Sequence, residues 1–293
     1  MQTPHRLTPV AVGRPWGGGR FGTVEGERVG ELWLTGDDAR LDDGRSLAES
    51  GLAGDVPLVK LLDVGGLLSV QVHPDDGLAR AMYGPGSVGK HEMWVVLEAV
   101  DDAQLYLGLA PGAGVDALYS GDAETVRSAM RRLQPRRGEA IDVPPGTVHA
   151  PGPGLVLYEV MQRSDITFRI FDWGRPRPLH VDESRRALRP RAVPEPIEAA
   201  GGVGRWTLSD AAAPFRVERM RVAGDPVVLA ADVPMVVSVV EGEPELGRSG
   251  GEKEWPLGVE GYWPLEAGSH WLLEAGAWTV AGLGEVLVAA SKS

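Results

Sequence analysis

Three short segments of the chain carry side chains of the kinds that bind divalent metal ions. They are segment 69–74 (Ser-Val-Gln-Val-His-Pro), segment 90–94 (Lys-His-Glu-Met-Trp) and segment 144–149 (Pro-Pro-Gly-Thr-Val-His). Together they offer a nitrogen and oxygen donor set that a borderline divalent cation accepts. Taken singly, each donor has an ordinary structural explanation, but three such segments favour a metal site. The candidate ligands are Gln71, His73, Glu92 and His149.

The spacing within these segments is typical of β-strands that carry polar side chains on one face. Alternate side chains of an extended strand share a face. Ser69, Gln71 and His73 therefore point one way, and the two valines between them point the other way. Lys90 and Glu92 share a face in the same manner. This alternation predicts a β-barrel with a polar interior that could carry chemistry.

The composition favours a globular protein made of many short strands. The chain has 293 residues, of which 43% are hydrophobic, and this is enough for two domains with a core each. Glycine (40 residues) and proline (23 residues) are abundant and long helical patterns are scarce, which favours strands joined by tight turns. Cysteine is absent, so any metal must be held by histidine and oxygen ligands.

The charge and hydropathy of the chain argue against several classes of partner. A formal net charge of −12 argues against nucleic-acid binding, because no basic field is present to displace the counterions of phosphates. An anionic substrate would need a local cationic pocket. The sequence has no run of about 18 apolar residues that would predict a membrane span, and residues 1–15 lack the apolar stretch of a signal peptide. We expect a soluble cytoplasmic protein.

Short strands are expected along most of the chain, with two helices between them. One short helix is expected near 46–50. A longer helix begins at Asp122 as its N-cap, carries Arg131 and Arg132 in its C-terminal half, and ends before Pro135. The expected strands span 30–34, 57–62, 67–73, 93–97, 103–109, 139–143, 154–161, 166–171, 215–222, 227–229, 235–241, 261–265, 270–273 and 285–289.

A change in composition divides the chain near residue 190. Segment 189–196 is rich in Pro, Arg and Glu and is typical of a linker. We therefore expect a domain at 1–190 that carries the metal site, and a second all-β domain at 191–293. The second domain has one histidine, His270, with no carboxylate at alternating spacing. We interpret His270 as structural.

Single charges lie in three otherwise apolar strands. Lys60, Glu159 and Arg169 each occupy such a position, and Lys90 adds a fourth charge beside a candidate ligand. A buried charge is costly unless a partner of opposite sign is present. For Lys60 that partner is either a structural carboxylate or a substrate phosphate. Four such residues favour a charged interior that holds a charged small molecule.

Four motifs of the chain resemble those of the type I mannose-6-phosphate isomerases. They are Leu-Ser-Val-Gln-Val-His-Pro-Asp-Asp (68–76), Gly-Lys-His-Glu-Met-Trp (89–94), Pro-Pro-Gly-Thr-Val-His-Ala (144–150) and Ser-Asp-Ile-Thr-Phe-Arg-Ile-Phe-Asp-Trp (164–173). The resemblance extends over about 14–182, while the C-terminal third has no matching motif. It is closest to the short bacterial form. It implies an all-β fold of two cupin-like (jelly-roll) β-domains with a few short helices.

The resemblance also implies a zinc-dependent enzyme with one Zn²⁺ per chain. Such an enzyme interconverts mannose-6-phosphate and fructose-6-phosphate through an enediol(ate) intermediate. The family's zinc ligands correspond to the four candidates named above, and its substrate-side residues to Lys60, Ser69 and Lys90. Its acid and arginine pair corresponds to Glu159 and Arg169, with Arg169 holding a hydroxyl or the developing oxyanion. Either Glu159 or Lys90 would move the proton, and the sequence does not choose between them.

Two other functions fit the same residues. Two histidines and a carboxylate also match the facial triad of non-haem iron enzymes, which would make the chain a metal-dependent cupin oxygenase. The second alternative is a non-catalytic phosphosugar-binding cupin, although none of the matched catalytic positions is lost. A small phosphosugar is the partner expected of the isomerase. The sequence leaves the oligomeric state, the physiological metal and the substrate range open.

Overall fold

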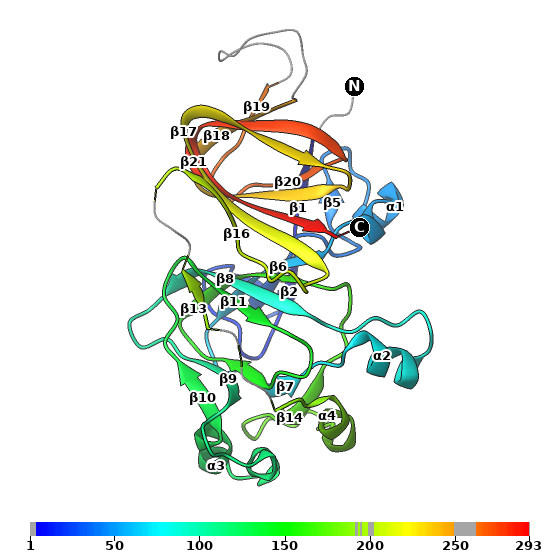
Figure 1. The fold of residues 1–293 in the computed structure, drawn as a ribbon, viewed down its shortest axis with the longest axis vertical. Helices are drawn as coiled ribbons and strands as arrows, with labels where there is room; N and C mark the ends of the chain where they lie inside the picture. Colours follow the sequence, from blue (N-terminus) through cyan, green and yellow to red (C-terminus); the bar gives the residue numbers. More distant parts are fainter. Residues whose placement is uncertain (1–3, 191–192, 194, 199–201, 249–261, 293) are drawn as a thin grey trace. The chain divides into compact units, whose positions relative to one another are not determined.

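The computed structural model describes residues 4–190, 193, 195–198, 202–248 and 262–292, and the chain divides into two compact units. One, called the central unit here, consists of Ala11–Trp33 and Leu58–Glu198. The other, called the terminal unit, consists of Met1–Val10, Leu34–Pro57 and Ala199–Ser293. Both are built mainly of antiparallel strands (Figure 1), so the expected all-β class is confirmed. The cupin-like assignment stays a prediction.

Two antiparallel sheets form the central unit. In the described part of the chain, the larger sheet has the order β15-β11-β8-β13-β6-β4-β2, with β3 paired to β4, and the smaller sheet has the order β10-β9-β12-β7-β14. The larger sheet contains β15 (Ile197–Glu198), β11 (Glu139–Val143), β8 (Glu92–Ala99), β13 (Leu155–Met161), β6 (Leu58–Val64), β4 (Glu27–Trp33), β2 (Val10–Gly13) and β3 (Thr23–Val24). The smaller sheet contains β10 (Met130–Leu133), β9 (Leu105–Leu109), β12 (His149–Pro151), β7 (Val70–Val72) and β14 (Phe168–Phe171).

Apolar residues of both sheets meet in one core of the central unit. Leu107 of β9 belongs to the same buried cluster as Trp94 of β8 and Leu157 of β13. These residues alternate along their strands with side chains of the opposite face, as extended backbone requires. Truncating a leucine in such a core costs about 2–5 kcal/mol, so these contacts fix the spacing between the sheets. The candidate site residues lie on the same inner face, as described below.

The outer face of the smaller sheet is covered by helical segments. Val70, Val72 and Phe168 belong to a second buried cluster that also contains Val126 of α3 and Ala187 of α4. The covering segments are η2 (Val115–Tyr119), α3 (Ala123–Ser128) and α4 (Val181–Ala187), and Figure 1 shows the two α-helices beside this sheet. Val70 and Val72 of β7 therefore point outward, and Gln71 between them points inward.

The short helices agree only in part with the sequence prediction. α1 (Leu47–Ser50) forms where expected, with a capping box between Ser46 and Glu49. Asp122 caps α3 as expected, because its side chain accepts a hydrogen bond from the Thr125 amide. The predicted length of this helix was wrong: it ends at Ser128, and Arg131 and Arg132 lie on β10.

The early end of α3 follows from strand pairing. Met130 pairs with Leu109 of β9, and this pairing draws the chain into the sheet directly after the last helical turn. Sheet hydrogen bonds there override a local helical tendency, which is a weak determinant by itself. α2 (Asp76–Tyr83), α4 and the short 3₁₀ turn η1 (Ala53–Asp55) were not predicted.

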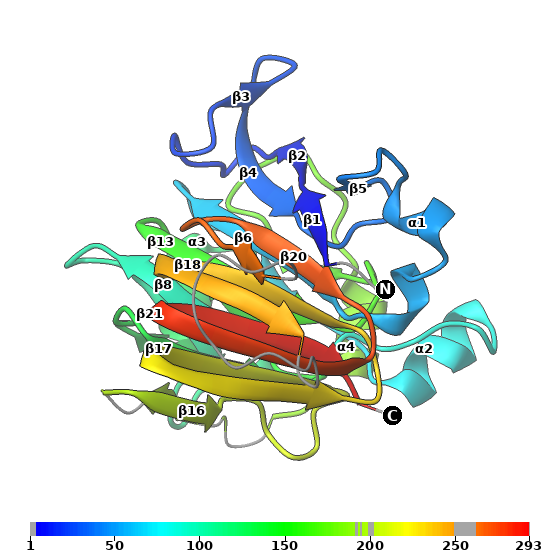
Figure 2. The same cartoon turned by 90° about the horizontal axis from the view of Figure 1, so that it is seen from above.

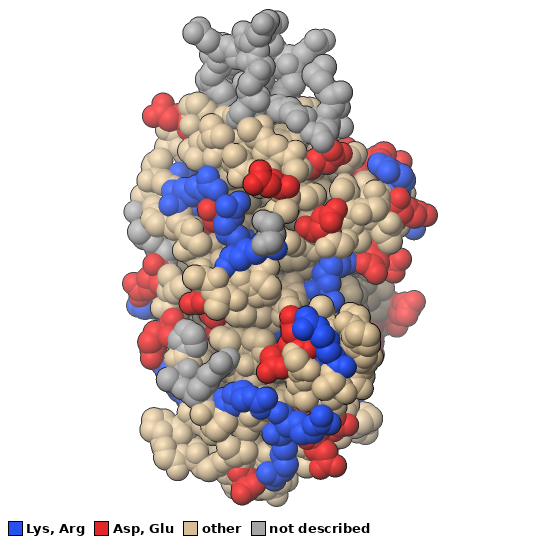
Figure 3. Space-filling view, turned by 45° about the vertical axis from the view of Figure 1, so that its right-hand side comes forward, with Lys and Arg blue, Asp and Glu red and all other residues tan. Residues whose placement is uncertain are grey.

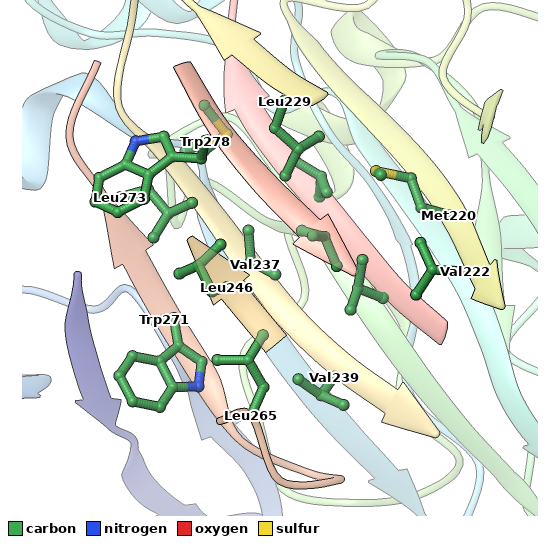
Figure 4. Packing of buried hydrophobic residues seen from close by; sticks show 14 of the residues in the cluster. Met220, Val222, Leu229, Val237, Val239, Leu246, Leu265, Trp271, Leu273 and Trp278 are labelled. Atoms are coloured by element: carbon green, nitrogen blue, oxygen red, sulfur yellow. The ribbon is translucent and has the colours of Figure 1, made fainter. Parts of the chain in front are cut away.

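The terminal unit is one twisted sheet built around three long strands. Its described strands run in the order β16-β17-β21-β18-β20-β1-β5, with β19 paired to β18, and Figures 1 and 2 both show β17, β21 and β18 side by side. Apolar side chains gather on one face of this sheet (Figure 4), including Trp278, Leu246 and Met220. The strands are β16 (Gly204–Thr207), β17 (Phe215–Ala231), β21 (Gly276–Ser291), β18 (Met235–Arg248), β20 (His270–Leu273), β1 (His5–Thr8), β5 (Arg40–Leu41) and β19 (Tyr262–Pro264).

Two segments from the N-terminal part of the chain pair within the terminal unit. β1 pairs with β20 through His5 and Leu272, and with β5 through Leu7 and Leu41. The sequence predicts one boundary near residue 190. It does not predict that β1 and β5 pair within the terminal unit, because pairing between distant strands leaves no local pattern. Of the predicted linker at 189–196, residues 191, 192 and 194 lie outside the described residues.

On the face drawn in Figure 3, acidic and basic side chains are interspersed. Among the residues that the structure describes, no helix is long and apolar enough to cross a membrane.

Candidate metal centre

Three of the four candidate ligands converge inside the central unit. His73 Nε2 lies 3.3 Å from Glu92 Oε2, and His149 Nε2 lies 3.4 Å from the same oxygen. The two imidazole rings are 4.9 Å apart between centroids. One donor atom from each residue lies within 4.8 Å of the others, and all three residues are buried. This spacing suits three ligands of one cation.

Strand register brings these residues together. His73 directly follows β7, Glu92 begins β8 and His149 begins β12. His149 stands opposite Gln71 in the smaller sheet, and Glu92 stands opposite Met161 in the larger sheet. The ligands therefore come from two facing sheets.

Each histidine is oriented by a backbone carbonyl. His73 Nδ1 lies 2.8 Å from the Ile166 oxygen, and His149 Nδ1 lies 3.0 Å from the Thr147 oxygen. A carbonyl oxygen only accepts, so Nδ1 carries the proton in both rings. The Nε2 lone pairs then point toward Glu92, which is the arrangement that metal-binding histidines have in proteins.

The charge state of the three residues also fits a cation. Burial lowers the pKa of His149 to about 3 and lowers the pKa of His73, so both rings are neutral near pH 7. Burial raises the pKa of Glu92, but Lys90, His73 and His149 lower it by more, so the pKa lies well below its ordinary value. Among the described residues, His73 Nε2 and Glu92 Oε2 have no hydrogen-bond partner. A bound metal ion would satisfy these buried atoms.

Of three further candidates, Gln71 and Lys90 each contact one of the three ligands directly, and Ser69 contacts Gln71. The Gln71 amide nitrogen is 3.1 Å from His149 Nε2, and the Ser69 hydroxyl donates to the Gln71 carbonyl oxygen over 3.4 Å. Lys90 is buried, and its ammonium lies 2.6 Å from Glu92 Oε1. Burial lowers the pKa of Lys90 but Glu92 and Glu159 raise it more, so Lys90 is charged.

A second cluster of charges lies on the inner face of β4, β6 and β13. Lys60 Nζ is 3.7 Å from Glu159 Oε2 and 3.7 Å from Glu31 Oε2. The Trp94 indole N–H donates to Glu159 Oε1 over 2.9 Å. Burial, together with the negative charge of Glu92, raises the pKa of Glu159 above its ordinary value.

Arg169 occupies a less buried position at the edge of the smaller sheet. It stands opposite Gln71 in the strand register, and its guanidinium donates to the Pro178 oxygen over 2.7 Å. Its Nε lies 4.0 Å from Asp172, whose carboxylate is also held by Arg175. In the described part of the chain, the side chain of Arg169 contacts Pro178 and Asp172 rather than the three ligands.

Sequence reasoning missed several residues of the charged cluster. Arg14 and Trp33 both donate hydrogen bonds to Glu31, and the Trp33 ring lies beside Lys60. Glu31 offered the same signal as Lys60, a single charge within an apolar strand. The partnership of the two strands could not be derived from the sequence, because it depends on which strands become neighbours.

Comparison with known proteins places the chain in a family. The chain matches no family model, so this placement rests on its similarity to individual proteins. A probable mannose-6-phosphate isomerase of Bacillus subtilis is 31% identical over 220 residues, 64% of this chain and 69% of that protein. The mannose-6-phosphate isomerase ManA of Bacillus subtilis is 29% identical over 276 residues, 82% of this chain and 86% of that protein.

A solved structure agrees with these relatives. The crystal structure of the mannose 6-phosphate isomerase from Bacillus subtilis matches 98% of this chain and 99% of that chain, with a TM-score of 0.81 and 27% sequence identity. The expected family is therefore confirmed over nearly the whole chain, including the C-terminal third in which the sequence offered no motif. This chain belongs to the mannose-6-phosphate isomerase family of enzymes.

Proposed function

We propose that this protein is a zinc-dependent aldose–ketose isomerase that interconverts mannose-6-phosphate and fructose-6-phosphate. The observation that carries the proposal is the buried group of two neutral imidazoles and one carboxylate, in a chain of this family. We assign the catalysis to the central unit, within residues 1–190, and expect a soluble cytoplasmic enzyme.

His73, Glu92 and His149 would hold the metal, with Gln71 as the fourth ligand. Imidazole nitrogen and carboxylate oxygen donors suit zinc, and a catalytic site also keeps a position open for water or substrate. When bound, zinc supplies Lewis acidity that lowers the energy of negative charge developing on sugar oxygens. The backbone carbonyls at Ile166 and Thr147 keep the two rings in the ligand orientation.

Two residues are candidates for moving the proton between C1 and C2 of the substrate. Glu159 is buried and its pKa is raised, so its carboxyl group exchanges protons closer to neutral pH than an exposed one does. Lys90 is a charged donor held by Glu92 and could protonate an oxygen. Such a positioned group accelerates proton transfer by about 10²–10⁴-fold. Formation of the enediol(ate) intermediate and its conversion to the product sugar both require this proton transfer.

The remaining candidates would bind the substrate. We propose that Lys60 and Ser69 bind the phosphosugar. The binding energy from the part of the substrate that lies far from the reacting carbons helps to position those carbons. Arg169 would hold a hydroxyl or the developing oxyanion with its planar guanidinium. This guanidinium donates to the Pro178 oxygen, so substrate binding would exchange that contact for a sugar oxygen.

One experiment tests the proposed function. Purified protein is incubated with mannose-6-phosphate, with and without a chelator, and fructose-6-phosphate is measured. We expect product that disappears with the chelator and returns with added zinc. Iron in the purified protein together with oxygen uptake would instead indicate an oxygenase, and tight phosphosugar binding without turnover would indicate a binding protein.

A further inference from the structure

A row of four side chains crosses the larger sheet of the central unit beside the metal ligands. Trp33 of β4 stands opposite Lys60 of β6, Lys60 stands opposite Glu159 of β13, and Glu159 stands opposite Trp94 of β8. Directly opposite residues in an antiparallel pair lie on the same face of the sheet. Lys60 and Glu159 are therefore set side by side by the strand register, between two indole rings.

Lys60 is enclosed but not tightly bound. Its side chain is only 8% exposed, and its ammonium lies 4.3 Å from the centroid of the Trp33 ring. Its distances to Glu31 and Glu159, 3.7 Å each, are within ion-pair range but longer than a hydrogen bond. The positive charge is stabilised while the N–H groups stay able to meet an incoming oxygen.

Glu31 is fixed far more firmly than the lysine it faces. Arg14 binds its carboxylate in a two-pronged pair, with Nε 3.0 Å from Oε1 and Nη2 3.0 Å from Oε2. The Trp33 indole N–H donates to Oε2 over 2.6 Å. Burial raises the pKa of Glu31, but Lys60, Arg14 and Trp33 together lower it to about 2, so it is ionised at neutral pH.

The arrangement has more parts than a plain buried ion pair requires. Arg14 and Glu31 already neutralise each other, and Lys60 and Glu159 would do the same. Glu31 nevertheless presents the oxygen shared with Trp33 toward the lysine. We propose that Glu31 and Trp33 are positioning residues, which place the Lys60 ammonium beside Glu159 so that it meets a substrate oxygen. This rests on the proposed function, in which Lys60 binds substrate.

A double-mutant cycle in the full-length, zinc-loaded protein tests the inference. The variants are Glu31→Gln, Lys60→Gln and the double variant, with kcat and KM measured for mannose-6-phosphate. If Glu31 acts through Lys60, E31Q lowers kcat/KM about tenfold in the wild-type background, mainly through KM, and less than about twofold in the K60Q background. A tenfold loss in both backgrounds would overturn the proposal, because Glu31 would then act independently of Lys60.

Two further variants separate positioning from folding. Glu98→Gln removes the carboxylate of the half-exposed pair with Arg20 and should leave kcat and KM unchanged. Trp33→Phe keeps an aromatic ring beside Lys60 but removes the N–H that holds Glu31. We expect W33F to raise KM with its thermal unfolding close to wild type, and a lower unfolding temperature with unchanged KM would contradict a positioning role. If the wild-type protein forms no fructose-6-phosphate, the proposed function itself fails.

Discussion

His73 and Glu92 come from opposite sheets of the central unit, yet His73 Nε2 lies only 3.3 Å from Glu92 Oε2. The imidazole proton is on the other nitrogen, where it meets the Ile166 carbonyl. Two buried acceptor atoms thus face each other without a proton between them. Such a pair is unfavourable by itself, and a cation between the two sheets would convert the repulsion into two bonds. Metal binding is therefore expected to stabilise the fold in addition to its role in the reaction.

Removal of a ligand should remove the metal. We expect His149→Ala to remove bound zinc and to abolish isomerase activity, as measured by elemental analysis after dialysis and by product formation, because even the loss of a hydrogen-bond partner of a metal ligand lowers metal affinity about 10–100-fold. His270→Asn is the matched control, since it also replaces a buried histidine, but in the terminal unit. A zinc content in H149A equal to that of H270N would reject His149 as a ligand.

Replacement of Arg169 should slow turnover while the metal stays bound. Arg169→Ala removes a guanidinium that we assign to a sugar oxygen, and the loss of one such donor typically lowers kcat about 10²–10³-fold. Zinc content should match the wild type, because the guanidinium contacts Pro178 and Asp172 rather than the three ligands. Unchanged kcat would exclude Arg169 from the mechanism.

Gly89 should be essential for the segment that carries Lys90 and Glu92. A Cβ at this position would lie 2.6 Å from the Pro74 oxygen and 2.7 Å from the Asp76 nitrogen, both backbone atoms. Gly89→Ala is therefore expected to destabilise the protein by about 1–3 kcal/mol and to reduce activity through displaced Lys90.

A nearby glycine supplies the control for this substitution. Gly86 has no atom within 4 Å of an added Cβ, so Gly86→Ala should change the free energy of unfolding by no more than about 0.5 kcal/mol. Denaturant unfolding and steady-state kinetics of the two variants check the prediction. Equal behaviour of G89A and G86A would show that the close backbone approach at Gly89 has no consequence.

The terminal unit should lose stability in mildly acidic solution because of His270. Burial lowers the pKa of His270 from 6.5 to about 4, and the charge of Arg6 lowers it as well. Between pH 6.5 and 4 the unfolded chain binds a proton that the folded chain does not, so stability falls as the pH falls. The loss contributed by this residue amounts to about 3 kcal/mol, and it levels off below pH 4.

Replacement of His270 isolates this contribution. His270→Asn should flatten the pH dependence of the unfolding free energy between pH 6.5 and 4, relative to wild type. Denaturant unfolding at several pH values measures the difference between the two proteins. Parallel curves for wild type and variant would show that His270 keeps an ordinary pKa in the fold.

The shared face of Gln71 and His73 was predictable because it depends on a local pattern. Their convergence with Glu92 and His149 depends on strand register, and was expected only from the donor types and the resemblance to the family. Alternation along 69–73 places Gln71 and His73 on one face whatever the partner strand. The pairing of Glu31 with Lys60 was not predictable, since it needs β4 and β6 to be neighbours in a particular register. The end of α3 was missed for the same reason, because the competing strand contact lies at Leu109.

The chain passes from the terminal unit to the central unit, back again, and once more in each direction before it ends. No single cut can therefore release either unit whole. On the ribosome, the first strand is made more than two hundred residues before the strand at His270–Leu273 with which it pairs. His73, Glu92 and His149 are all made long before that, so the strands of the central unit that carry them can pair before this later partner strand of β1 exists.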